Sequence, residues 1–181
     1  MTEETIINQT INWIQSVVIG CNFCPFAAKA LLKKTVRYVV LPSANTKLVL
    51  EKLMQEIYHL DKDEDIETTF IILPENFGDF NAYLDVVQVA EELMEEEDYD
   101  GIYQLASFHP QYCFAGEANN DAANYTNRSP YPMLHILREE SITNALENFP
   151  DPESIPEKNI AFARGKGMAF MQNLLNRSYG H

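Results

Sequence analysis

Thr68-Thr69-Phe70-Ile71-Ile72-Leu73 is the stretch that decides the fold, because an unbroken run of β-branched and apolar residues predicts a buried strand. Two similar runs, Val36–Leu41 and Ile102–Ser107, lie before and after it. The segments between the runs have the length and apolar spacing of helices, at about Asn45–Leu60 and Asp79–Glu97. Strands joined through helices pair in parallel. The sequence therefore predicts an α/β fold with a small, mostly parallel sheet of three or more strands flanked by helices.

Further helices are expected outside these strands. Isoleucine and valine recur at helical spacing near the N-terminus until Gly20, which is typical of a helix end. Near the C-terminus, two more apolar periodic segments follow proline residues. The predicted outer helices span about Ile7–Val18, Pro25–Lys34, Pro132–Asn148 and Pro156–Asn176.

The length and composition indicate one globular domain over residues 1–181. Hydrophobic residues make up 46% of the 181 and charged residues 22%, which excludes a disordered chain. No apolar run approaches the length of about 20 residues that a membrane span needs. The acidic start, Met1–Thr5, is unlike a signal peptide, and three cysteines suit a reducing compartment. A cytoplasmic location is therefore expected.

The formal charge of −14 argues against binding to nucleic acid or to an anionic membrane. The charge is concentrated in residues 51–100, which hold 17 acidic and 2 basic residues. This acidic segment is either a solvated helix surface or a docking patch for a basic partner. The oligomeric state stays open.

Proline follows each predicted strand, at Pro42, Pro74 and Pro110. If the strands are parallel, these ends lie on the carboxyl edge of the sheet, where open α/β folds bind ligands. A long irregular stretch then runs from Phe108 to Tyr131. Its aromatic residues argue against disorder, so we expect either a functional loop or a structural cover for the sheet edge.

On the helix expected after Pro132, His135 and Arg138 fall on the inward stripe with Leu134 and Ile142. A guanidinium facing inward must be paired or must face a ligand. Arg138 is therefore either a structural residue, bonded to acidic side chains or backbone carbonyls, or part of an anion site. In an anion site, the second arginine would be Arg128, and the helix N-terminus behind Ser129 would supply backbone donors.

Three short polar residues, Asp121, Asn124 and Asn127, recur at intervals of three in the same loop. Such residues either cap turns or orient the polar groups of a substrate.

Cys24 directly precedes Pro25, at the N-terminus of a predicted helix, a position that lowers the pKa of a thiol. The competing interpretation is a small buried hydrophobe. A redox pair with Cys21 is disfavoured, because the pair follows a helix rather than a strand. A zinc site would need four ligands without compact spacing, so no metal is predicted. Those four ligands would be Cys24, His109, Cys113 and His135.

Three segments carry a resemblance to a known family: 22–27 (NFCPFA), 104–110 (QLASFHP) and 124–135 (NYTNRSPYPMLH). On these motifs the chain resembles the bacterial family catalogued as domain of unknown function 1415. The resemblance implies a protein of the bacterial cytoplasm and assigns no activity. It also implies that Cys24 is the family cysteine, whereas Cys21 and Cys113 lie outside the family pattern.

The favoured function is an enzyme that acts on a small anionic metabolite. His109 or His135 would be the general acid or base, because imidazole titrates near neutrality. Asp121 would orient a histidine and Cys24 would be a nucleophile. The substrate would be held by Arg128, Arg138, Asn124, Asn127 and Ser129. The alternatives are a non-catalytic ligand-binding or regulatory protein that uses the same pocket or the acidic segment, and a metalloprotein. No cofactor is assigned.

Overall fold

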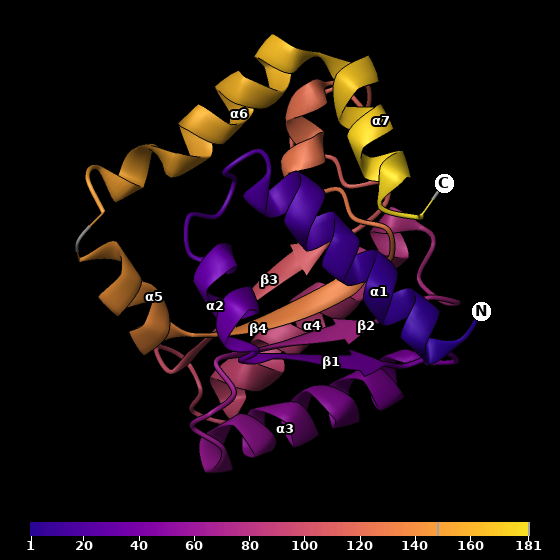
Figure 1. Cartoon of the computed structure of the whole chain (residues 1–181). Helices are drawn as coiled ribbons and strands as arrows, with labels where there is room; N and C mark the ends of the chain where they lie inside the picture. The colour runs from indigo at the N-terminus through magenta and orange to yellow at the C-terminus, as the bar shows by residue number, and fades with distance from the viewer. Residues whose placement is uncertain (148, 181) are drawn as a thin grey trace.

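The computed structural model describes residues 1–147 and 149–180 as a four-stranded sheet with helices on both faces (Figure 1). The strands lie in the order β1-β2-β4-β3 across the sheet. They are β1 (Val36–Val40), β2 (Thr68–Ile72), β3 (Tyr103–Phe108) and β4 (Met133–Arg138). The α-helices are α1 (Glu3–Trp13), α2 (Ala27–Lys33), α3 (Thr46–Lys62), α4 (Phe80–Glu96), α5 (Glu139–Leu146), α6 (Ile155–Lys166) and α7 (Met168–Arg177).

The α/β class is confirmed, but the prediction of a mostly parallel sheet is wrong. Among the described strands, only β1 and β2 pair in parallel, whereas β4 lies between β2 and β3 and is antiparallel to both. The segment after Pro132 was expected to be a helix and instead forms this fourth strand. Met133, Leu134 and Ile136 are fully buried there, so both faces of the strand are apolar. A short apolar run buried on both faces has no periodicity that separates a strand from a helix.

The helix that follows, α5, spans only Glu139–Leu146. The predicted helix end at Asn148 lies outside the described residues. The predicted single C-terminal helix is also divided, because α6 and α7 meet at Gly167, whose φ of 82° is in the left-handed region that glycine favours.

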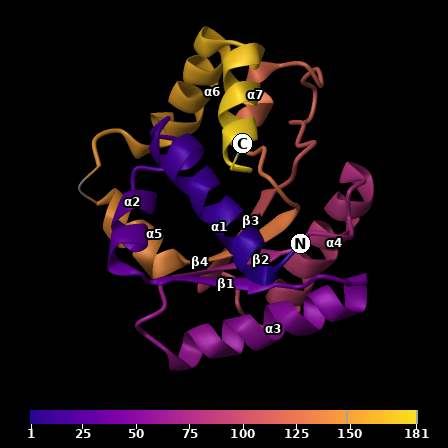
Figure 2. The same cartoon turned by 45° about the vertical axis from the view of Figure 1, so that its right-hand side comes forward.

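Helices cover both faces of the sheet (Figure 2), and each face carries its own apolar core. Helices α3 and α4 cover one face through residues such as Leu53 and Val86. The N-terminal helix covers the other face, where the Trp13 ring contacts Phe70 and Phe108 edge-on. We call these the α3–α4 face and the α1 face. None of the helices in the described residues combines the length and hydropathy that a membrane crossing requires.

A π-helix, η1 (Ile14–Ile19), continues α1 and ends at Gly20. A Cβ atom at Gly20 would lie 2.3 Å from the carbonyl oxygen of Ser16, closer than a carbon can approach. Gly20 ends the helix, as predicted. The wide turn of η1 also requires glycine there, because it leaves no room for a Cβ atom.

Candidate functional site

The carboxyl ends of β1, β2 and β3 lie at one edge of the sheet, as expected from their prolines. β4 runs antiparallel to β2 and to β3, so β3 keeps the direction of β1 and β2 although it does not pair with them. The loop after β3 contains a 3-10 helix, η2 (Ala122–Thr126), and crosses this edge.

His109 lies at the start of that loop and is fully buried. Its Nε2 donates to the carbonyl oxygen of Phe77 at 2.8 Å, and its Nδ1 accepts from the backbone amide of Gln111 at 2.9 Å. Burial lowers the pKa of His109, in keeping with this uncharged arrangement. Both ring nitrogens are therefore used within the protein, and His109 fastens the loop to the turn before α4.

Arg128 is also used within the loop. Its Nε donates to the carbonyl oxygen of Tyr112 at 3.1 Å, and its Nη2 donates to that of Asn119 at 2.8 Å. The guanidinium carbon lies 4.7 Å from the centroid of the Tyr125 ring. Arg128 thus holds three parts of the loop together.

Asn124 is fully buried and accepts from the backbone amide of Phe114 while it donates to the carbonyl oxygen of Ala118. Asn127 and Ser129 likewise donate to backbone oxygens nearby. The geometry of these three residues matches the turn-stabilising interpretation of the sequence.

Asp121 lies outside hydrogen-bond contact with any histidine of the described chain. Its carboxylate accepts from Arg164 of α6 and from the backbone amide of Ala123. The Arg164 hydrogen bond lowers the pKa of Asp121 to about 2. Glu117 pairs with the same guanidinium at 2.9 Å, so the acidic residues of the loop anchor it to α6.

His135 lies on β4 and faces the α1 face, with its ring stacked on Phe70 at a centroid distance of 3.8 Å. Its Nε2 is 2.5 Å from Oγ1 of Thr68, and that hydroxyl donates its only proton to the carbonyl oxygen of Ile136 at 2.6 Å. The proton between the ring and the hydroxyl therefore belongs to Nε2. This assigns the tautomer in which Nδ1 carries a lone pair.

Nδ1 of His135 has no hydrogen-bond partner in the part of the chain that the structure describes. The fully buried side-chain atoms there without a partner are Tyr38 Oη and Thr69 Oγ1, so Nδ1 is unpartnered but not completely enclosed. Burial of the rest of the ring lowers the pKa of His135, which leaves the imidazole uncharged at neutral pH.

His109 and His135 do not line one pocket. His109 packs against Phe80 and Tyr83 of α4, on the α3–α4 face, whereas His135 points to the opposite face. The direction of His135 was expected from a helix after Pro132. The segment is a strand, in which successive side chains point to opposite faces of the sheet.

Arg138, at the far end of β4, points to the α3–α4 face and away from the loop. It donates to the carbonyl oxygens of Leu60, Asp63 and Ile66 and to the hydroxyl of Tyr103. The geometry matches the structural alternative, an arginine bonded to backbone carbonyls.

Cys24 precedes α2 by three residues rather than capping it, since the helix begins at Ala27. Burial raises the pKa of the Cys24 thiol, and hydrogen bonds from the backbone amides of Phe26 and Ala27 offset this only in part. A thiol with a raised pKa is protonated at neutral pH, which fits the interpretation of Cys24 as a small buried hydrophobe. In the described chain, no three His, Cys, Asp or Glu side chains lie close enough together to share a metal ion.

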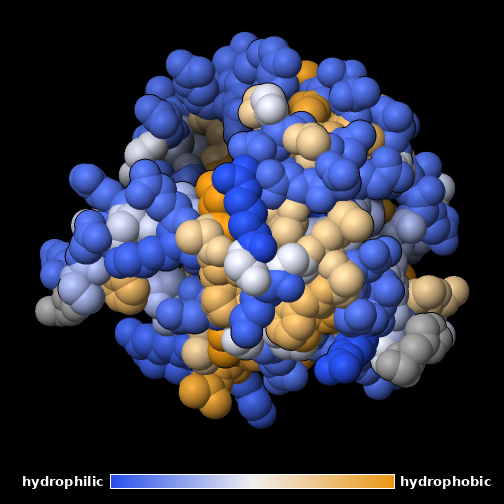
Figure 3. All heavy atoms as spheres, turned by 90° about the horizontal axis from the view of Figure 1, so that it is seen from above, coloured by the Kyte–Doolittle hydropathy of each residue, from blue (hydrophilic) through white to orange (hydrophobic). Residues whose placement is uncertain are grey.

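Sequence reasoning missed the residues around His135. Tyr38, Phe70 and His135 are cross-strand neighbours, and their rings stack across three strands. The Tyr38 hydroxyl is buried without a partner, and burial raises the pKa of Tyr38 to about 12. The sequence does contain one signal, since Tyr38 and Phe70 are aromatic residues in the middle of two strand-like runs. Placing His135 beside them requires the register of β4, which the sequence did not predict. Seen from above, the surface of the molecule carries apolar side chains gathered among hydrophilic ones (Figure 3).

Comparison with known proteins gives one match. The model of a family described as "Protein of unknown function (DUF1415)" matches residues 5–173. Neither the curated proteins nor the solved structures contain a match to this chain.

Proposed function

The chain belongs to the DUF1415 family, whose description names no activity, and we propose from its geometry that it is an enzyme in which His135 acts as a general base. The observation that carries the proposal is that the two ring nitrogens of His135 differ in their hydrogen bonding. Thr68 holds Nε2, whereas Nδ1 has no hydrogen-bond partner among the described residues and keeps its lone pair free. A histidine held by one nitrogen and open at the other can accept a proton from a substrate.

A small anionic metabolite is the substrate class that fits this base. Burial keeps the ring uncharged in the free protein, and a bound negative charge nearby would raise the pKa of His135 toward neutrality. A general base is most effective when its pKa lies near the working pH. The basic helix α2, with Lys29 and Lys33, packs on the same face through Leu31 and would attract such an anion.

The unpartnered hydroxyl of Tyr38 supports a polar ligand on this face, because a buried polar group without a partner is costly. The proposal does not use Arg128 or Arg138, whose donors bond to the protein itself. A cytoplasmic location belongs to the same proposal and is supported by three cysteines that form no disulfide.

Two measurements test the proposal. Diethylpyrocarbonate, which acylates unprotonated and accessible imidazoles, should modify His135 and leave His109 unmodified when the sites are mapped by mass spectrometry. The wild-type protein should also convert at least one component of a defined mixture of phosphorylated and carboxylated hydroxy compounds.

The variant His135→Gln should abolish that conversion, whereas His59→Gln, on the surface of α3, should retain it. Tight binding of a component without conversion would support the alternative of a non-catalytic ligand-binding protein. Conversion by His135→Gln at the wild-type rate would refute the role of His135.

A further inference from the structure

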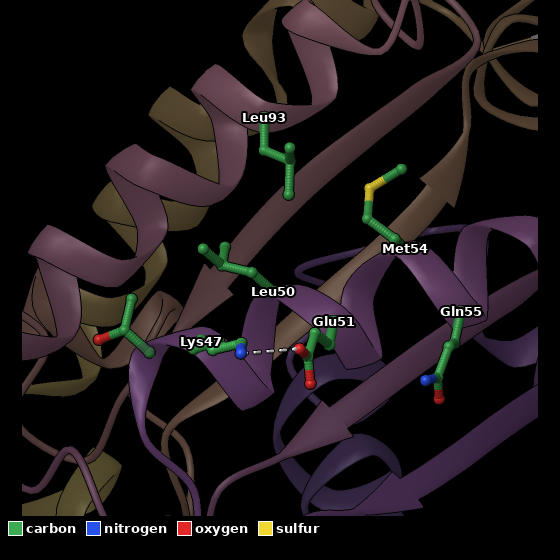
Figure 4. Close-up of a pocket in the computed structure, with 7 residues that line it drawn as sticks. Lys47, Leu50, Glu51, Met54, Gln55 and Leu93 are labelled. Carbon is green, nitrogen blue, oxygen red and sulfur yellow. Dashed lines mark ion pairs between the residues drawn. The ribbon is translucent and has the colours of Figure 1, made fainter.

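A surface groove lies between α3 and α4 (Figures 2 and 4), whereas His135 points to the opposite face of the sheet. We call it the α3–α4 groove and define it by Lys47, Leu50, Glu51, Met54, Gln55 and Leu93. Its volume is about 630 Å³. The function proposed above uses none of these residues.

The floor of the α3–α4 groove is apolar. Leu50 and Met54 point from α3 toward Leu93 of α4, across the space between the two helices (Figure 4). The apolar stripe continues along each helix, because Tyr58 and Val89 lie one turn from Met54 and Leu93 and are 57% and 39% exposed.

The rim of the groove is acidic. Two lysines of α3 lie at its edge: Lys47 pairs with Glu51 at 3.7 Å, and Lys52 donates to Gln55 at 2.8 Å. On α4, Glu92, Glu95 and Glu96 are exposed around Leu93, and no basic residue occupies the last turn. Acidic residues at a helix C-terminus oppose the helix dipole, so their placement does not stabilise α4.

We propose that the α3–α4 groove binds a basic amphipathic helix of a partner protein. A helix lays one apolar face into such a groove with contacts every three to four residues, and its basic flanks would meet the acidic rim. A second copy of this chain is a poor occupant, because each copy has a formal charge of −14. Charge complementarity therefore selects a basic partner.

The test uses a fluorescein-labelled synthetic peptide of leucine and lysine, about four helical turns long, with its leucines on one face. Its affinity for the full chain is measured by fluorescence anisotropy. Two further peptides serve as controls: a scrambled sequence of the same composition, and an amphipathic peptide with glutamate in place of lysine.

The amphipathic lysine peptide should bind, and the two control peptides should bind at least tenfold more weakly. Met54→Gln and Leu93→Gln should each weaken binding about tenfold, whereas the matched variant Leu84→Gln, exposed on α4 outside the groove, should leave binding unchanged. Binding should also fall as salt is raised. Circular dichroism of each variant confirms that it is folded.

Equal binding of the scrambled peptide would show an unspecific acidic surface and overturn the proposal. So would equal weakening by Leu84→Gln, the absence of binding, or a dimer in solution that Leu93→Gln dissociates. His135→Gln should bind the peptide as the wild type does, so this test is independent of the proposed function.

Discussion

Arg138 donates a hydrogen bond from Nη2 to the carbonyl oxygen of Leu60, in the last turn of α3. The same guanidinium also bonds to the carbonyl oxygens of Asp63 and Ile66, in the segment that leads to β2. Carbonyls at a helix C-terminus lack partners within the helix, and a cation there also complements the helix dipole. Arg138 therefore caps α3 from a neighbouring strand.

Arg138→Met should lower the free energy of unfolding by about 2–4 kcal/mol, because it leaves several partly buried carbonyls without a donor. Urea denaturation monitored by circular dichroism measures the loss. The exposed Arg177→Met, in the last turn of α7, should change stability by less than about 0.5 kcal/mol. An anion-binding Arg138 would give the opposite pattern, with unchanged stability and a loss of stabilisation by phosphate.

Gly20→Ala should destabilise the protein by about 1–3 kcal/mol, because the new Cβ would meet the carbonyl oxygen of Ser16. Gly78→Ala is the matched control, since a Cβ there has no atom within 4 Å. Thermal unfolding of the two variants measures the difference. Equal melting temperatures would mean that η1 relaxes to an ordinary α-helix at no cost.

Asp121 should titrate with a pKa of about 2, because the Arg164 hydrogen bond stabilises its charged form. Since the pKa is lowered on folding, this pair supports the fold above the ordinary pKa of about 4 and loses its effect as the pH falls toward 2. Carboxyl NMR of the Arg164→Gln variant should show the Asp121 midpoint rising toward its ordinary value. Arg177→Gln should leave it in place.

The sequence predicted the three strands because each is an apolar run ending near proline, and it predicted their common direction because helix-sized segments join them. It did not predict β4, because the turn before Met133 and the apolar run after it fit a helix equally well. That single error placed His135 and Arg138 on one surface, whereas a strand directs residues 135 and 138 to opposite faces.

The candidate site was predictable only in part for the same reason. The loop after β3 was expected to be either functional or a structural cover, and its Asn124 and Arg128 side chains bond to the loop's own backbone. Local sequence cannot distinguish a side chain that holds its own loop from one that holds a ligand. The partner of His135, Thr68, lies 67 residues away along the chain.

The two buried histidines should make stability depend on pH below neutrality. Burial lowers the pKa of both His109 and His135 in the folded protein, whereas the unfolded chain titrates near the ordinary value of about 6.5. Below that pH the unfolded state binds more protons than the folded state, so the free energy of unfolding falls as the pH falls.

Each histidine should contribute a slope of up to about 1.4 kcal/mol per pH unit in this range, and the contribution should vanish above about pH 7. Urea denaturation at several values between pH 7.5 and pH 5 measures the slope. His135→Phe removes one titrating group while it keeps a ring stacked on Phe70. The slope of this variant should therefore be smaller by the contribution of one histidine, up to about 1.4 kcal/mol per pH unit. Leu84→Gln, exposed on α4, removes no titrating group and should keep the wild-type slope. A wild-type slope in His135→Phe would mean that the folded protein binds a proton at His135 as readily as the unfolded chain does. The ring would then be charged near pH 5, and the open lone pair on which the general base depends would be lost there.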